Sequence, residues 1–248
     1  IDSSYLNNLD KVFESELDKL KNGIFNKSGE EFNLNSPKQL GDILFDKLKL
    51  VSKPKKTKTG QYSTSEEVLS SLANEHEIIR SILEWRSLDK LQNTYVRSLP
   101  NEVSARTGRI HTKFNQTVTT TGRLSSNNPN LQNIPIRTQN GQKIREAFVP
   151  KNDDFELLAA DYSQIELRVI ASISKDNNMI DAFVKNQDIH TTTASKIYDI
   201  DPENVTREQR GNAKTVNFGI IYGVSAFGLS QQTNLSRSES KIMIDNYF

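Results

Sequence analysis

One stretch, residues 205–223, constrains the fold most, because it carries the start and stop signals of a single helix. Thr206 followed by Gln209 has the spacing of a capping box, in which two side chains satisfy free backbone N–H groups at a helix N-terminus. Gly223 suits the left-handed turn that ends many helices. We therefore predict a helix over residues 207–222.

One face of this predicted helix carries a ridge of two cations followed by two aromatic rings. Side chains four residues apart advance by only about 40° around a helix axis, so such residues line up over roughly 18 Å. The ridge consists of Arg210, Lys214, Phe218 and Tyr222. Its cations lie near the helix N-terminus, where the helix dipole favours anions, and its rings can stack on a sugar or a base. A nucleoside triphosphate has the same polarity, with an anionic end and a flat end.

A second interpretation of the ridge is an ordinary amphipathic helix whose aromatic residues belong to the core. Ala213, Val216 and Ile220 fall on the opposite side of the helix and would be buried in either case. Composition alone leaves both interpretations open.

Composition excludes several classes of protein. The 248 residues contain no cysteine, so neither a disulfide framework nor a thiolate zinc site is possible. The three histidines, His76, His111 and His190, are far apart and offer no metal-binding pair. No apolar run approaches the length of a bilayer span, and the polar N-terminus is not a signal peptide. We expect an intracellular protein, and we interpret a chain that starts inside a predicted helix without methionine as a fragment.

A net charge of +1 hides an uneven distribution along the chain. Residues 103–145 contain seven Lys and Arg but no Asp or Glu, which is typical of a surface that binds a polyanion. Alternation over residues 110–116 predicts a strand there, and residues 121–135 are rich in amides and hydroxyls. Residues 53–58 add four lysines in six positions. The alternative for these segments is solvated loops whose polar residues only form turns.

A single acid, Asp161, directly follows a short apolar run. Residues 155–160 predict a buried strand that delivers Asp161 to its carboxyl end. Ser163 and Glu166 have capping-box spacing and would open the next helix. Mg²⁺ is usually bound by one or two carboxylates together with waters and phosphates, so Asp161 is a candidate ligand. The alternatives are that Asp161 is an ordinary turn residue and that Glu166 only closes the cap.

Four segments together resemble family A DNA polymerases, the bacterial DNA polymerase I group. The pattern Arg-x-x-x-Lys-x-x-x-Phe-Gly-x-x-Tyr-Gly at residues 210–223 resembles their nucleotide-binding O helix, and the sequence Asp-Tyr-Ser-Gln-Ile-Glu-Leu-Arg at residues 161–168 resembles their motif A. Residues 121–135 resemble their primer-template-binding segment, and residues 30–40 resemble their thumb. The resemblance covers essentially the whole chain, with a departure at Gly211, where these polymerases often carry a second basic residue.

The resemblance implies a role for each candidate residue. Catalysis would depend on Asp161, Lys214 and Arg210. The incoming deoxynucleoside triphosphate would contact Tyr162, Glu166, His190, Arg210, Lys214, Phe218 and Tyr222. The two Mg²⁺ ions of the complete enzyme would bind the Asp161 carboxylate, with the Tyr162 carbonyl assisting. DNA would contact Lys53, Lys55, Lys56, Lys58, Arg123, Gln132, Asn133 and Arg137.

The fold that the resemblance implies is α+β and mostly helical, a right-hand polymerase architecture. Residues 1–103 would form the thumb, with a basic tip at residues 53–58. Residues 104–175 would form a partial palm with an antiparallel sheet, and residues 176–248 would form partial fingers. We expect a monomer whose partners are primer-template DNA and dNTPs, with no membrane. Its location would be the bacterial cytoplasm, in association with the nucleoid.

The implied function is template-directed DNA synthesis, in which a primer hydroxyl gains a deoxynucleotide by two-metal phosphoryl transfer. Glu166 would also fill the space that a ribose 2′-hydroxyl needs. The later His-Asp-Glu motif of the family does not occur in this chain, so we expect the fragment alone to be inactive. The alternative is a non-catalytic nucleic-acid-binding module. A P-loop hydrolase is excluded, because the chain contains no G-x-x-x-x-G-K-[S/T].

Overall fold

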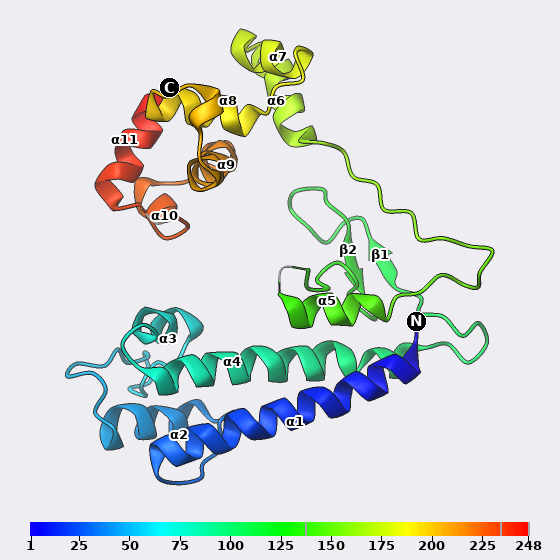
Figure 1. The fold of residues 1–248 in the computed structure, drawn as a ribbon, viewed down its shortest axis with the longest axis vertical. Helices are drawn as coiled ribbons and strands as arrows, with labels where there is room; N and C mark the ends of the chain where they lie inside the picture. The colour runs from blue at the N-terminus through cyan, green and yellow to red at the C-terminus, as the bar shows by residue number, and fades with distance from the viewer. Residues whose placement is uncertain (137, 234, 248) are drawn as a thin grey trace. The chain divides into compact units, whose positions relative to one another are not determined.

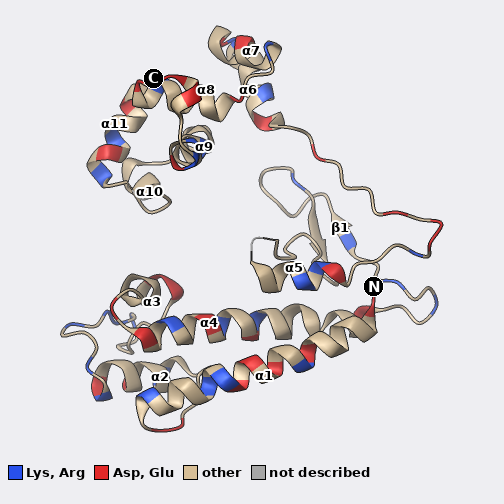
Figure 2. Cartoon of the chain, in the orientation of Figure 1, with Lys and Arg blue, Asp and Glu red and all other residues tan. Residues whose placement is uncertain are grey.

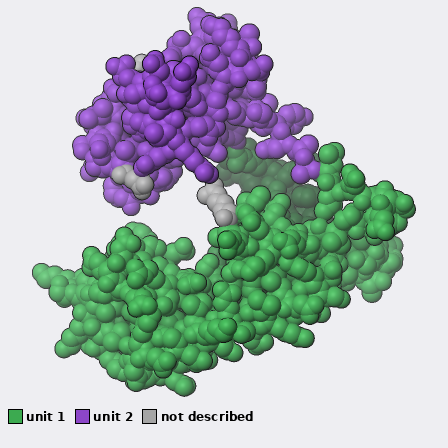
Figure 3. All heavy atoms as spheres, in the orientation of Figure 1, with its two compact units in different colours: residues 1–158 green, residues 159–248 purple. Residues whose placement is uncertain are grey.

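The computed structural model describes residues 1–136, 138–233 and 235–247, and the chain divides into two compact units. Unit 1 comprises residues 1–158 and unit 2 comprises residues 159–248, which Figure 3 draws in green and purple. Both units are built mainly from helices, with one small antiparallel sheet in unit 1 (Figure 1). This agrees with the predicted mostly helical α+β class.

Unit 1 is organised around two long helices that lie side by side, α1 (Ser3–Ser28) and α4 (Glu77–Leu91) (Figure 1). Asp2 caps α1 by accepting the Tyr5 N–H at 2.8 Å, and Gly29 ends the helix in a left-handed conformation with φ 74°. The buried face of α1 includes Leu6, Leu9, Phe13, Leu17 and Ile24. These side chains belong to the main hydrophobic core of unit 1.

Shorter elements complete unit 1. Helix α2 (Pro37–Gly41), capped by Ser36, continues directly as a π-helical segment (Asp42–Lys47). After α3 (Glu66–Leu72) and α4, the chain forms a second π-helical segment (Gln92–Val96) and a 3₁₀ turn (Leu99–Glu102). Helix α5 (Gln139–Glu146) contributes the buried Ile144 to the same core as α1 and α4.

The sheet has two antiparallel strands, β1 (Lys113–Asn115) and β2 (Ser125–Asn127). Phe114 stands opposite Ser126 in its register. The strand predicted over residues 110–116 is confirmed at its centre and is shorter than the alternation suggested. The antiparallel character expected for this part of the chain is confirmed as well.

The predicted buried strand at residues 155–160 is wrong. These residues form no regular structure and are exposed, with Phe155 52% and Leu158 94% accessible. A strand needs a neighbour to satisfy its backbone groups. In the described part of the chain, the two named strands pair with each other and leave no partner for this run. The boundary between the two units falls inside it.

Unit 2 is wholly helical in its regular structure. It contains α6 (Ile165–Ser174), α7 (Asn177–Val184), α8 (Ile189–Tyr198), a 3₁₀ turn (Pro202–Asn204), α9 (Arg207–Ile221), α10 (Ala226–Ser230) and α11 (Arg237–Tyr247). Helices α8 and α9 pack closely along one another. Among the residues described in unit 2, small hydrophobic clusters form around Val216 and around Leu167. Within the described residues of both units, no helix combines the length and apolar character needed to cross a bilayer.

Candidate active site

Helix α9 forms as its sequence predicts. Thr206 accepts the Gln209 N–H at 3.2 Å, and the Gln209 side chain accepts the Thr206 N–H at 3.0 Å, which completes the capping box. The helix ends at Ile221, one residue earlier than predicted, and Gly223 adopts φ 69°. Ala213 and Val216 are fully buried, so the opposite ridge faces outward.

A cavity of about 340 Å³ in unit 2 gathers most of the predicted nucleotide-site residues. Its lining consists of Asp161, Tyr162, Gln164, Ile165, Glu166, His190, Lys214 and Phe218. Its acidic wall consists of Asp161, from the segment before α6, and Glu166, from the first turn of α6. Helix α8 supplies the histidine, and α9 supplies the cation and the ring. The predicted metal ligand and the predicted phosphate-binding lysine therefore line one cavity. Arg210 and Tyr222 are outside this lining.

The helix start beside Asp161 and Glu166 differs from the predicted capping box. Helix α6 starts after Gln164, which adopts a left-handed conformation with φ 53° and makes no side-chain cap, so Ser163 and Glu166 do not form a capping box. The Ser163 carbonyl instead accepts the Arg168 Nε–H at 2.9 Å. Because Glu166 is not occupied by a cap, its carboxylate accepts a hydrogen bond from the Tyr222 hydroxyl at 3.2 Å. Tyr222 thus contacts the acidic wall from the end of α9.

Arg210 is joined to an acid that the sequence interpretation did not assign. Its guanidinium lies 2.6 Å from the Asp188 carboxylate, which also caps α8 by accepting the Thr191 N–H at 2.9 Å. Burial alone would raise the pKa of Asp188, but the hydrogen bonds from Arg210 and Thr191 outweigh it and hold that pKa below its usual value. The signal available in the sequence was the N-cap position of Asp188, two residues before His190.

His190 is a buried residue that is only 3% accessible. Its Nδ1 lies 3.0 Å from the side-chain amide nitrogen of Asn217, and its ring centroid is 5.9 Å from that of Phe218. Burial lowers the pKa of His190; the nearby Asp188 opposes this, while Arg210 and Lys214 add to it. Sequence reasoning missed Asn217, although its place beside Val216 on the buried side of α9 was a readable signal.

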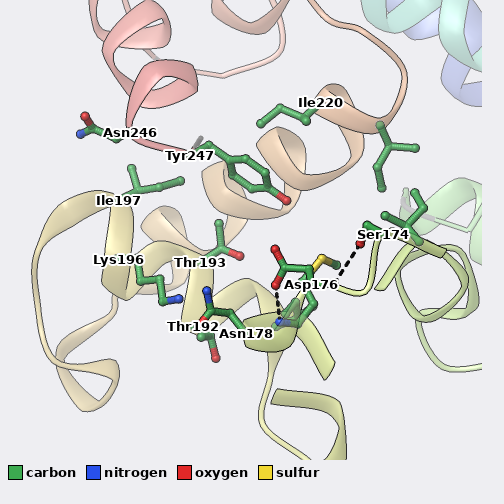
Figure 4. A pocket seen from close by; sticks show the side chains of 14 residues that line it. Ser174, Asp176, Asn178, Thr192, Thr193, Lys196, Ile197, Ile220, Asn246 and Tyr247 are labelled. Carbon is green, nitrogen blue, oxygen red and sulfur yellow. Dashed lines mark hydrogen bonds between the residues drawn. The ribbon is translucent and has the colours of Figure 1, made fainter. Parts of the chain in front are cut away.

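A second cavity in unit 2, of about 410 Å³, has a different chemistry (Figure 4). Ile197, Ile220 and Tyr247 contribute to its wall, and its charged residues are Asp176 and Lys196. It gathers none of the residues predicted to bind nucleotide. Figure 4 labels Thr193, whose hydroxyl also bonds to Asn217.

The predicted DNA-binding residues that the structure describes all lie in unit 1 and are exposed. In the basic loop, drawn blue in Figure 2, Lys56 lies over the Tyr62 ring and Lys55 is 3.8 Å from Glu67. Gln132 donates to the Leu124 carbonyl at 3.2 Å, and the Asn133 carbonyl accepts the Tyr95 hydroxyl. Arg123 is exposed in the loop before β2. Arg137 lies outside the described residues.

The donors of the acidic wall fit Mg²⁺. Among the described residues, no three His, Cys, Asp or Glu side chains converge as a self-sufficient metal site. Asp161 and Glu166 are two carboxylates on one cavity, which suits an ion that completes its shell with water and phosphate oxygens.

Comparison with known proteins decides the family. The pattern that defines DNA polymerase family A matches residues 3–248. The chain belongs to the family A DNA polymerases.

Relatives of this polymerase chain support the same assignment. It is 52% identical to DNA polymerase I of Geobacillus stearothermophilus, over all of this chain and 28% of that protein. It is 50% identical to the thermostable DNA polymerase I of Thermus thermophilus, over all of this chain and 30% of that protein. The chain therefore spans less than a third of the length of these two relatives.

A solved structure shares the fold of this polymerase chain. It is described as the POL domain of Pol1 from M. smegmatis in complex with DNA primer-template and dNTP. The similarity has a TM-score of 0.87 at 42% identity and covers all of this chain and 43% of that one. The mostly helical α+β fold predicted from the resemblance is confirmed.

Proposed function

We propose that this chain carries the nucleotide-binding part of a DNA-directed DNA polymerase, which extends a primer on a template by two-metal phosphoryl transfer. The observation that carries the proposal is the cavity of unit 2, because Asp161, His190 and Lys214 all line it. An acid that holds metal and a cation that holds phosphate are the two requirements of this reaction.

Each side chain has a defined task in this proposal. Lys214 and Arg210 bind the phosphates and stabilise the negative charge that develops as pyrophosphate leaves. Phe218 offers its ring to the sugar and base, and Tyr162 is 80% accessible beside it on the same cavity. Asp161, with the Tyr162 carbonyl, would hold Mg²⁺, which would supply Lewis-acid activation of the primer hydroxyl and the phosphate.

Arg210 has to exchange partners when phosphate binds. In the structure it pairs with Asp188 at 2.6 Å. A triphosphate carries more charge than one carboxylate and accepts the bidentate hydrogen bonds that a guanidinium offers. We infer that Asp188 holds Arg210 extended in the absence of nucleotide and that phosphate oxygens take its place.

DNA is the proposed partner of unit 1. The exposed Lys53, Lys55, Lys56 and Lys58 suit phosphate contacts, and Arg123, Gln132, Asn133 and Arg137 suit the sugar-phosphate backbone and minor groove. In this proposal, residues 1–103 form the thumb, residues 104–175 form part of the palm and residues 176–248 form part of the fingers. The proposed protein is a monomer that acts at the nucleoid in the bacterial cytoplasm.

The test is nucleotide binding by an Asp161→Ala variant. We expect wild-type chain to bind a fluorescent dNTP in the presence of Mg²⁺ and Asp161→Ala to lose the Mg²⁺-dependent part of that affinity. Asp153→Ala is the matched control, because Asp153 is an exposed acid outside the cavity. Duplex DNA affinity should stay unchanged in both variants.

Two results would contradict the proposal. Equal dNTP binding by wild type and Asp161→Ala would favour the non-catalytic nucleic-acid-binding module. Normal primer extension by the 248 residues alone would overturn the expectation that this fragment is inactive without the later motif.

A further inference from the structure

Asn217 is a polar side chain in an apolar position. It lies on α9 beside Val216, and both residues are 0% accessible. A buried amide costs free energy unless its donors and acceptor are bonded. Its amide nitrogen lies 3.0 Å from His190 Nδ1 and 3.1 Å from the Thr193 hydroxyl, which also reaches its carbonyl oxygen at 3.2 Å. Two residues of α8 therefore contact both ends of the Asn217 amide.

This arrangement determines where the His190 proton resides. With the Asn217 amide in this orientation, its nitrogen faces Nδ1 and can only donate, so Nδ1 accepts and carries no proton. A neutral imidazole then carries its single proton on Nε2. Burial, which disfavours the charged ring, is consistent with a neutral His190.

Nε2 is the ring nitrogen that Asn217 does not engage. His190 lines the same cavity as Lys214 and Asp161, and Nδ1 is engaged by α9. An Nε2–H group is a hydrogen-bond donor, which suits a phosphate oxygen. The opposite tautomer would present a lone pair, which repels a phosphate oxygen and attracts a metal ion.

We propose that Asn217 is a positioning residue that fixes His190 as the neutral Nε2–H tautomer, so that His190 donates to a triphosphate oxygen and does not act as a base or a metal ligand. The identity of the ligand rests on the proposed function, whereas the tautomer is a property of the free chain. Asn217 acts through His190 and does not itself line the cavity.

The direct test is ¹⁵N NMR of the histidine rings at neutral pH. The chain has three histidines, and His76 and His111 both lie in unit 1, so His76→Gln together with His111→Gln leaves His190 as the only signal. We expect the Nδ1 shift of an unprotonated nitrogen and the Nε2 shift of a protonated one. The reversed pattern, or shifts averaged between tautomers, overturns the proposal without any change at Asn217.

Two variants test whether Asn217 causes the pattern. Asn217→Asp replaces the donor by an acceptor and should move the proton to Nδ1, while Asn217→Ala should give averaged shifts. Asn212→Asp is the matched control, because Asn212 lies on the same helix but bonds to Tyr198, and it should leave the His190 pattern unchanged. An unaltered pattern in folded Asn217→Ala contradicts the positioning role.

A nucleotide titration separates this proposal from the function on which it rests. Adding dTTP with Mg²⁺ to wild type should shift the His190 Nε2 signal, and Asn217→Asp should bind dTTP about tenfold more weakly, the effect of one hydrogen bond near 1.4 kcal/mol. If the tautomer is as proposed but dTTP leaves Nε2 unmoved, the proposed nucleotide site fails and the tautomer assignment stands. If dTTP binds normally and the tautomer is reversed, only the present inference fails.

Discussion

Arg210 and Asp188 form an ion pair of 2.6 Å between α9 and the N-terminus of α8. The same carboxylate caps α8. Arg210, which is predicted to bind phosphate, is therefore held by Asp188, two residues before His190. This ion pair joins α9 to α8 at the candidate site.

Asp188→Asn should reduce the loss of unfolding free energy that occurs when the pH falls from 7 to 3. The pKa of Asp188 is depressed below its ordinary value of 3.8, so its contribution is complete above about pH 4 and is lost as the pH falls through the lower folded value. The pair is partly exposed, which limits the contribution to about 1 kcal/mol. Urea unfolding at pH 7 and pH 3 measures it. An identical pH dependence in both proteins would contradict the role of this ion pair.

His190 should titrate below its ordinary pKa of 6.5, because burial disfavours the imidazolium. A depressed pKa means that the unfolded chain takes up the proton first, so His190 stabilises the fold fully above pH 6.5 and this contribution is lost as the pH falls towards the folded value. The ring signals of the single-histidine protein, followed between pH 8 and pH 4, report the pKa directly. A midpoint at or above 6.5 would be inconsistent with the buried ring.

Gly211 and Gly219 provide a matched pair of tests on α9. A Cβ at Gly211 meets nothing within 4 Å, so Gly211→Ala should stabilise the chain by about 1 kcal/mol through helix propensity. A Cβ at Gly219 would lie 2.5 Å from Val224 Cγ1, so Gly219→Ala should destabilise by about 1–3 kcal/mol. Denaturant unfolding of both variants gives the two signs. If both variants changed the free energy of unfolding in the same direction, the contact with Val224 would not limit the side chain at residue 219.

Glu166→Ala should relax the discrimination between dATP and ATP. The proposed role of Glu166 is to fill the space of a ribose 2′-hydroxyl, and the Tyr222 hydroxyl at 3.2 Å holds its carboxylate. We expect the preference for dATP to fall by roughly tenfold, about 1.4 kcal/mol. Competition binding against a fluorescent dNTP measures the ratio. Tyr222→Phe keeps the carboxylate but removes the hydrogen bond, so its effect should be smaller. An unchanged ratio of dATP to ATP affinity in Glu166→Ala would contradict the proposed exclusion of the ribose 2′-hydroxyl by Glu166.

The sequence determined the features that depend on neighbours close along the chain. The capping box of Thr206 and Gln209, the left-handed Gly223 and the buried Ala213 and Val216 all follow from helix periodicity and from bonds within a few residues. The ridge order of Arg210, Lys214, Phe218 and Tyr222 was readable for the same reason.

Only the tertiary structure decided which groups become partners across helices. Asp188 with Arg210, and His190 with Asn217, are separated by 22 and 27 residues, and no local pattern predicts which of many polar side chains will meet. The apolar run at residues 155–160 makes the same point in reverse, because a strand exists only where another chain segment offers its hydrogen bonds. Helices satisfy their own backbone and can be predicted from local sequence, whereas strands and buried polar pairs depend on what the fold brings beside them.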